Sequence, residues 1–135
     1  MNLWERFQAW RHGPDQPEHL RRGQLGERAA KKHLRRLGLK FLTANFRSRR
    51  GEIDLVFRES ECLVFVEVKT RASDWFAPPQ VNVDLRKRRQ VARAARAYRR
   101  LLELDDQPYR YDVVTVILPP DETPRIDLIR NYWTF

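Results

Sequence analysis

The chain has little of what several common protein classes require. It holds one cysteine, Cys62, which excludes an internal disulfide framework. No apolar run approaches the roughly 20 residues of a membrane-spanning helix, and charged residues interrupt the N-terminal stretch where a signal peptide would lie. The histidines lack zinc-ligand spacing, and there is no glycine-rich phosphate-binding or dinucleotide-binding motif. We therefore expect a cytoplasmic protein with no membrane partner.

What the chain has in excess is positive charge. Lysine and arginine number 27 against 18 acidic residues, which gives a net charge of +9 over 135 residues. A hydrophobic content of 41% is ordinary for a globular protein, and the length suits one compact domain. Such a charge favours an anionic partner, with nucleic acid as the leading candidate. The alternative is a basic surface that serves only solubility.

Hydrophobic periodicity and turn residues predict seven elements in a single domain, 18–135, after an N-terminal helical appendage and linker, 1–17. The predicted order is helix, three strands, helix, two strands. That order indicates an α/β protein with a mixed central sheet flanked by helices. The predicted helices span 18–37 and 84–104, and the predicted strands span 40–46, 51–58, 62–70, 109–118 and 125–130.

The first predicted helix combines glycines with a carboxylate on its buried side. Gly23 and Gly26 thin the helix surface and would permit close approach to the sheet. Glu27 lies at the edge of the apolar face, where it serves either a site or a neighbouring arginine. Gly38 is expected to end the helix. The apolar face consists of Ala30, Leu34 and Leu37.

The second predicted helix begins after Asp84, a plausible N-cap. Lys87 lies on its buried stripe, one turn from the start, rather than on the solvent side. The rest of the predicted stripe is apolar: Val91, Ala94, Ala95, Tyr98, Leu101 and Leu102.

Two apolar strands each contain a carboxylate, Asp54 in the second strand and Glu67 in the third, and Lys69 follows closely. Acidic residues and lysine are depleted from strands and rarely buried without partners. The two strands are expected to form a hairpin. Depending on the turn, either Glu52 or Asp54 faces Glu67. Either way Asp54, Glu67 and Lys69 share one face of the sheet, unless a bulge separates them.

Two carboxylates on adjacent strands suit Mg²⁺ or Mn²⁺, which prefer oxygen ligands. A metal there would polarise a scissile phosphate and lower the pKa of an attacking water. Lys69 could orient that water or offset phosphate charge. Glu27 could join through a water, and Lys87 could contact the phosphate or the leaving group. The competing interpretation is a buried ion pair of Lys69 with Glu67 or Asp54 and no metal, which stabilises a core weakly.

A family resemblance rests on several motifs. The specific ones are Gly51 to Val56 and Val64 to Arg71; the weaker ones are Gly26-Glu27, Asn45 to Arg47, Val83 to Lys87, Tyr111 to Val114 and Ile129 to Asn131. Together they resemble the signature of the YraN-like bacterial family over about residues 20–133. That family is similar to the PD-(D/E)XK nucleases, specifically the archaeal Holliday-junction resolvases.

The resemblance implies a restriction-endonuclease-like αβββαβ core. It also implies that Asp54 is the motif aspartate, that Glu67 and Lys69 form the E-x-K element, and that Glu27 is the helix carboxylate. The backbone carbonyl of Val68 would be a further metal ligand. The sequence departs from the nuclease pattern at Ile53, where a proline usually precedes the aspartate.

The resulting hypothesis is a Mg²⁺- or Mn²⁺-dependent DNA endonuclease that acts on branched or otherwise structured DNA, for which a homodimer would be suited. The alternative is a non-catalytic nucleic-acid-binding adaptor that keeps the nuclease fold, with Trp75 and Phe76 stacking on bases. A third interpretation is a small structural protein with Trp4, Phe7 and Trp10 at an interface. The predicted nucleic-acid contacts are Arg49, Arg50, Arg71, Arg86, Lys87, Arg89 and Arg93.

Overall fold

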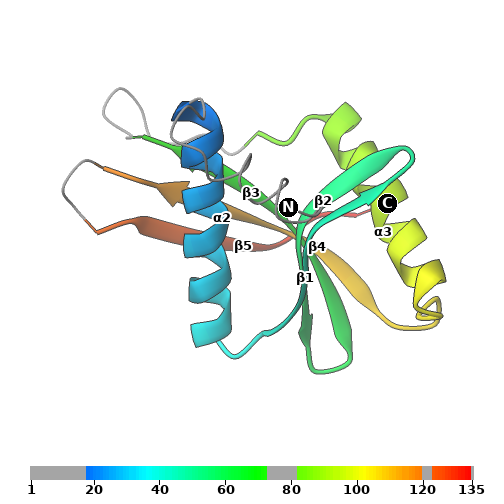
Figure 1. The fold of residues 1–135 in the computed structure, drawn as a ribbon. Coiled ribbons are helices and arrows are strands. Elements are labelled where there is room, and N and C mark those ends of the chain that lie inside the picture. Colours follow the sequence, from blue (N-terminus) through cyan, green and yellow to red (C-terminus); the bar gives the residue numbers. More distant parts are fainter. Residues whose placement is uncertain (1–17, 73–81, 120–122, 135) are drawn as a thin grey trace, which may run out of the picture.

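The computed structural model describes residues 18–72, 82–119 and 123–134 and shows an α/β fold built on a five-stranded mixed sheet (Figure 1). The strands lie in the order β1-β2-β3-β4-β5; β3 and β4 are parallel and the other neighbours antiparallel. The predicted fold class is confirmed, and the arrangement is consistent with a restriction-endonuclease-like αβββαβ core. The elements are α2 (Glu18–Arg36), β1 (Lys40–Ser48), β2 (Gly51–Glu59), β3 (Cys62–Arg71), α3 (Leu85–Leu101), β4 (Tyr109–Ile117) and β5 (Arg125–Trp133).

Some sequence predictions lie outside the described residues. These are the helix over 2–11 with Trp4, and the aromatic pair Trp75 and Phe76. The division of the chain at residue 17 stays a prediction. Neither of the helices that the structure describes is long and apolar enough to cross a membrane.

The two helices pack against two separate apolar clusters of the sheet (Figure 1). Ala30 and Leu34 of α2 pack with Val66 of β3 and Val114 of β4. The α3 cluster instead gathers residues of β2, β3 and β4 around one helix face: Ile53, Val56, Phe65, Val91, Ala94, Ala95, Tyr98, Tyr111 and Val113.

The end of α2 follows the glycine prediction, but the last apolar residue does not. Gly38 has φ +95° and its N–H donates to the Arg35 carbonyl at 3.0 Å, a helix end that needs the left-handed backbone. Leu37, expected in the core, is 48% exposed. The chain has already turned toward β1 there, so Leu39 takes the buried place instead.

At the start of α3 the predicted N-cap is confirmed, because Asp84 Oδ1 accepts a hydrogen bond from the Lys87 N–H at 2.8 Å. The predicted end is wrong. The helix stops at Leu101, and Leu101 and Leu102 are 71% and 47% exposed. Leu104, beyond the helix end, packs against the core instead.

The β2–β3 hairpin adopts the register that aligns Asp54 with Glu67. Glu59 pairs with Cys62 across a two-residue turn, and the ladder runs to the Leu55–Val66 pair. Beyond that pair the next positions are Asp54 and Glu67. Because the backbone ladder ends before them, their side chains meet where the two strands begin to separate.

Strand β2 also changes faces at Asp54. Ile53 belongs to the α3 cluster and Leu55 to the α2 cluster, although residues two apart in a regular strand share a face. Asn45, opposite on β1, has φ +53°, and neighbouring pairs Ala44–Leu55 and Phe46–Ile53 flank it. The strand therefore rolls over at the aspartate, which places Asp54 between the two helix-covered faces.

Candidate functional site

The carboxylates of Asp54 and Glu67 lie side by side at the point where β2 and β3 part. Asp54 Oδ2 accepts a hydrogen bond from the Val68 N–H at 2.8 Å, which ties the β2 side chain to the β3 backbone. The Asp54 and Glu67 carboxyl groups are also hydrogen bonded to one another. The Glu67 side chain is 6% exposed. Two acidic groups are thus held in direct contact in a nearly dry position.

Burial and the nearby Asp54 charge raise the pKa of Glu67 to about 8, against the opposing effects of Lys87 and Lys69. Burial also raises the pKa of Asp54, although the Val68 hydrogen bond and Lys87 lower it. Two carboxylates this close do not readily ionise together. The metal-free pair therefore holds a shared proton near neutral pH.

Two lysines from different elements provide positive charge beside the pair. Lys87 Nζ of α3 lies 3.7 Å from Glu67 Oε1 and 4.0 Å from Glu52 Oε1. Lys69 lowers the pKa of Glu67 through its charge. Among the described residues, however, Lys69 forms no ion pair with a carboxylate. The buried ion pair of Lys69 with Glu67 or Asp54, the competing structural interpretation, is therefore not what this site contains.

One oxygen of the pair remains without a partner. Glu67 Oε2 is buried and accepts no hydrogen bond. Buried polar atoms are almost always paired, so an orphaned carboxylate oxygen needs an explanation. A hard divalent cation is a natural partner for it. The described residues contain no group of three or more His, Cys, Asp or Glu side chains that could hold a metal. Two carboxylates completed by backbone and solvent oxygens are nevertheless what Mg²⁺ commonly accepts.

A cavity of about 270 Å³ opens beside the pair, between the start of α2 and the end of β3. Glu27, Asp54, Glu67 and Val68, all predicted as site residues, line it. A site buried on one side and open to a cavity on the other can receive both a small cation and a phosphate group. The remaining lining residues are Arg22, Gly23 and Thr70.

The two predicted close-approach glycines of α2 behave differently. A Cβ on Gly26 would overlap the Thr70 side chain, so this glycine lets the helix contact β3, as predicted. A Cβ on Gly23 would meet nothing within 4 Å. Gly23 therefore leaves space in the cavity and does not bring the helix closer to the sheet.

The sequence predictions missed three residues of this region. Arg22 lies five residues before Glu27 on α2 and lines the same cavity, but it is about 140° away around the helix, so no face pattern pointed to it. Thr70 follows Lys69 and contacts α2 where Gly26 allows it. Glu52 was considered only as the residue opposite Glu67, yet it lies beside Lys87 and Arg47. No sequence signal marks it as a partner of α3.

Most predicted nucleic-acid contacts lie exposed around α3 and the β1–β2 turn. Gly51 lies directly against the Gln90 backbone, which brings the turn beside the helix. Lys87 differs from the others because it is half-buried against Glu67. Arg71 is exposed at the end of β3, away from this group in the sequence. The exposed residues around α3 are Arg49, Arg50, Arg86, Arg89 and Arg93.

The chain is similar to a large set of bacterial proteins over the part that carries the site. It matches the model of the uncharacterised protein family UPF0102 over residues 26–116. A UPF0102 protein of Syntrophus aciditrophicus is 40% identical over 114 residues, covering 84% of this chain and 89% of the relative. Relatives from Porphyromonas gingivalis (42% over 104 residues, 77% of this chain and 76% of theirs) and Solibacter usitatus (42% over 111 residues, 81% and 83%) bear the same description.

Proposed function

The chain belongs to the uncharacterised protein family UPF0102, the YraN-like family that its motifs resemble, and we propose that it is a metal-dependent nuclease. The observation that carries the proposal is the carboxylate pair of Asp54 and Glu67, which lines a cavity and leaves the buried Glu67 Oε2 without a partner. The likeness of Asp54, Glu67 and Lys69 to the PD-(D/E)XK signature supports the same chemistry.

Asp54 and Glu67 would hold Mg²⁺ or Mn²⁺, with the Val68 backbone carbonyl as a further oxygen ligand and Glu27 reaching it through solvent. Bound there, the cation would polarise the scissile phosphate and help to ionise the attacking water. Displacing the shared proton frees both carboxylates to act as anions. The hydrogen bond from the Val68 N–H and the burial of the pair hold the two carboxyl groups close together. Cation binding would therefore favour loss of the proton that they share.

The two lysines have different parts in the proposed reaction. Lys87 lies between Glu67 and Glu52, so it offsets acidic charge and keeps the site from repelling a phosphate. Lys69 makes no ion pair with a carboxylate of the described residues, which leaves its ammonium available to orient the water or the phosphate. Arg22, which lines the same cavity, has the planar fork that suits a phosphate.

Nucleic acid is the proposed substrate because of the charge around this site. The whole chain carries +9, and exposed arginines occupy the β1–β2 turn and α3. A small phosphodiester would need no such surface, whereas a polyanion is attracted and retained by it. DNA, branched DNA in particular, is the substrate we propose, with a two-fold dimer as the form that would cut a junction symmetrically.

The decisive experiment compares Asp54→Asn with the parent protein on junction, flap and duplex DNA in Mn²⁺. We expect a rate loss of about a thousandfold, since losing a metal ligand costs several kcal/mol and 1.36 kcal/mol is tenfold. Glu61→Gln removes an exposed carboxylate at the hairpin turn and should cleave like the parent. An Asp54→Asn protein as active as the parent would end the proposal.

Metal titration separates the nuclease from the adaptor that keeps the fold without catalysis. Calorimetric titration with Mn²⁺ should show binding to the parent and none to Asp54→Asn. A parent that binds DNA in a salt-sensitive way but takes up no Mn²⁺ would instead favour the adaptor.

A further inference from the structure

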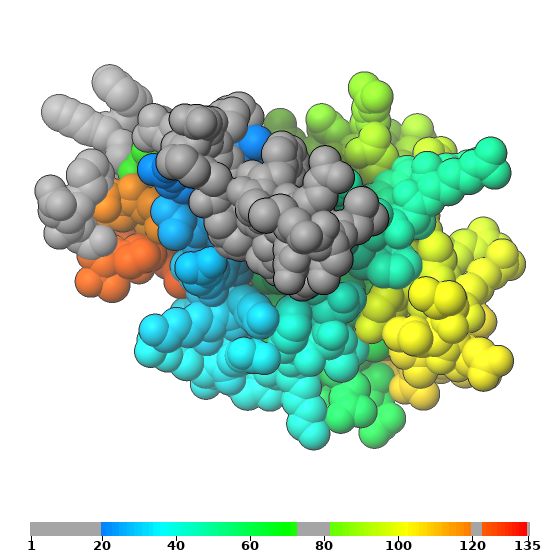
Figure 2. Space-filling model, viewed as in Figure 1, coloured from blue at the N-terminus to red at the C-terminus, as the bar shows by residue number. Residues whose placement is uncertain are grey.

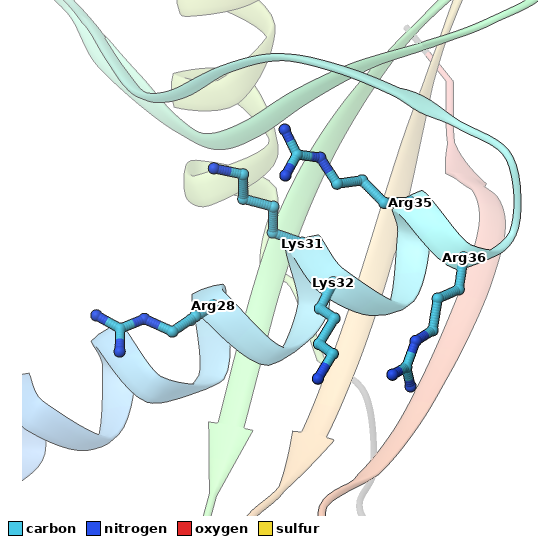
Figure 3. Close-up of a pocket in the computed structure, with 5 residues that line it drawn as sticks. All are labelled: Arg28, Lys31, Lys32, Arg35 and Arg36. Carbon is cyan, nitrogen blue, oxygen red and sulfur yellow. The ribbon is translucent and has the colours of Figure 1, made fainter.

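A second hollow lies on α2, beyond the carboxylate site, and it is lined entirely by cationic side chains. Its volume is about 420 Å³. The side chains come from one helix and extend to both sides of it (Figure 3). We call this surface the basic trough; its residues are Arg28, Lys31, Lys32, Arg35 and Arg36.

The spacing of the basic trough is that of a single helix stripe. From Arg28 the positions recur at three, four, seven and eight residues, so all five charges face outward together. Among the described residues none of the five forms an ion pair with a carboxylate. Like charges at these spacings destabilise a helix. An external anion bound to the stripe would relieve this repulsion.

Two of these side chains make cation–π contacts with the ring of Phe41. Lys31 Nζ lies 3.9 Å from the centroid of the Phe41 ring, and the Arg35 guanidinium lies 5.2 Å from it. Phe41 is itself held edge-on by Phe57 in the core. These cation–π contacts order the charges before any ligand arrives, which lowers the cost of binding.

The spacing of the charges is close to that of the phosphates along one strand of a duplex. Eight residues separate Arg28 from Arg36, about 12 Å of helix at a rise of about 1.5 Å per residue. Five charges over that length lie about 3 Å apart on average, against about 3.4 Å between phosphates along one strand of a duplex. In Figure 3 Lys31 and Arg35 extend to one side of the helix, and Lys32 and Arg36 to the other. Two rows of cations suit two backbones.

The basic trough and the carboxylate site share one helix. Glu27 lines the cavity of the site, and Arg28, the next residue, begins the trough. In the space-filling view this half of α2, blue to cyan, lies at the surface next to the start of β1 (Figure 2). A strand that leaves the site along α2 would therefore pass directly over the trough.

We infer that the basic trough binds the phosphate backbone of double-stranded nucleic acid, outside the place of cleavage. The inference rests on the proposed function in taking nucleic acid as the substrate. According to this inference, the bound duplex contacts α2 as well as the arginines of α3. It requires binding only, so it can be measured with cleavage switched off.

The test uses the full chain in EDTA and a fluorescent duplex, with binding followed by anisotropy over a salt series. The variant Lys32→Gln/Arg35→Gln/Arg36→Gln removes three exposed charges of the trough. We expect at least tenfold weaker binding, and a salt dependence reduced by about 0.9 in log–log slope for each phosphate that is no longer neutralised. The matched control, Arg58→Gln/Arg125→Gln/Arg130→Gln, removes the same charge from exposed positions on β2 and β5, outside α2 and α3. It should bind within about twofold of the parent, because salt screens charges that lie away from the bound duplex.

Several outcomes would overturn the inference. Equal weakening in both variants would mean a net-charge effect, and unchanged binding in both would mean the duplex lies elsewhere. Weaker binding of the trough variant to vesicles of four parts phosphatidylcholine and one part phosphatidylserine, with duplex binding intact, would assign the trough to a membrane surface. Inactivity toward DNA in Mn²⁺ would instead count against the proposed nuclease activity. The binding comparison would still test the basic trough, because it is measured in EDTA without cleavage. Glutamine is a good helix former, and unchanged unfolding midpoints would exclude misfolding.

Discussion

Two buried acidic residues lie on adjacent parallel strands, Glu67 on β3 and Asp112 on β4, and their surroundings differ. Asp112 Oδ1 accepts from Arg110 Nε at 3.0 Å and from the Asn131 N–H at 2.8 Å, and its Oδ2 accepts from Arg110 Nε at 3.1 Å. Each oxygen has a partner. Glu67 Oε1 lies near Lys87, and the carboxyl group is hydrogen bonded to Asp54, but Glu67 Oε2 has no partner.

The Asp112 carboxylate belongs to a network of ion pairs within the protein, in which Nη2 of Arg110 is buried without a hydrogen-bond partner. Glu59 Oε1 accepts from Arg110 at 3.0 Å and from Arg130 at 2.7 Å, so the network joins β2, β4 and β5. Asn131 has φ +52°, next to the break in pairing between β4 and β5. The Asp112 carboxylate caps that irregular backbone. Its surroundings account for the residue without any ligand.

The comparison contrasts a buried acid whose partners lie within the protein with the acid of the proposed metal site. Burial raises the pKa at both sites. At Asp112 the hydrogen bond from Asn131 and the charge of Arg110 act against the effect of burial on the pKa. At Glu67 the largest influence after burial is another acid, Asp54, which raises the pKa further. At Asp112 the neutralising positive charge comes from Arg110 of the same chain. At Glu67 one oxygen has no partner, and we propose that an external cation binds there.

The largest expected difference between the two regions is in stability. Asp112→Asn should lower the free energy of unfolding by about 3 kcal/mol, because the partly buried Arg110 side chain loses one of its two anionic partners and keeps only Glu59. Asp54→Asn should change it little or raise it, because it relieves a crowded acidic pair. Urea denaturation in EDTA measures both. Similar decreases in the two variants would contradict the distinction drawn here.

The next effect is a dependence on pH that only the Glu67 region should show. The folded protein keeps the Glu67 proton up to a pKa of about 8, whereas the unfolded chain loses it near 4.5. This contribution to stability is therefore full at low pH and lost as pH rises between those values. Glu67→Gln stays neutral, so in EDTA it should be more stable than the parent by up to about 4 kcal/mol at pH 8, less the contribution of the lost Lys87 contact, and by under about 1 kcal/mol at pH 5.

Adding Mg²⁺ should narrow that gap at pH 8, since the parent can bind the cation through Glu67 and the glutamine variant has lost a ligand. Denaturation curves of the two proteins that stay parallel across this pH range would show that the pair is not under the strain inferred for it.

The smallest effect concerns two glycines of α2, of which Gly23 lines the cavity beside Glu67. Gly26→Ala should destabilise the protein by about 1 kcal/mol, because its Cβ would overlap Thr70 and force α2 away from β3. Gly23→Ala, three residues earlier, meets open space and should be neutral or stabilising by under about 1 kcal/mol. Thermal unfolding of the two variants tests the comparison. Equal shifts would mean that α2 is not held closely there.

Local pattern alone was enough to predict the elements of this fold and much of the site. Period-two alternation and turn residues predict the strands. Asp84 and Gly38 predict helix ends because both effects are local: the Asp84 side chain caps a backbone N–H three residues away, and Gly38, which has no side chain, adopts the positive φ of a helix end. Carboxylates in apolar strands singled out Asp54 and Glu67 for the same local reason. The helix end near Leu101 could not be predicted, because Leu104, after the turn, competes for the same core.

The sequence by itself thus determined the order of elements, the basic charge and which acidic residues were out of place. Only the tertiary structure decided the hairpin register, the change of face at Asp54 and the orphaned oxygen of Glu67. The physical reason is range. Propensity and capping depend on neighbours along the chain, whereas register, burial and hydrogen-bond partnership depend on which distant groups reach the same place.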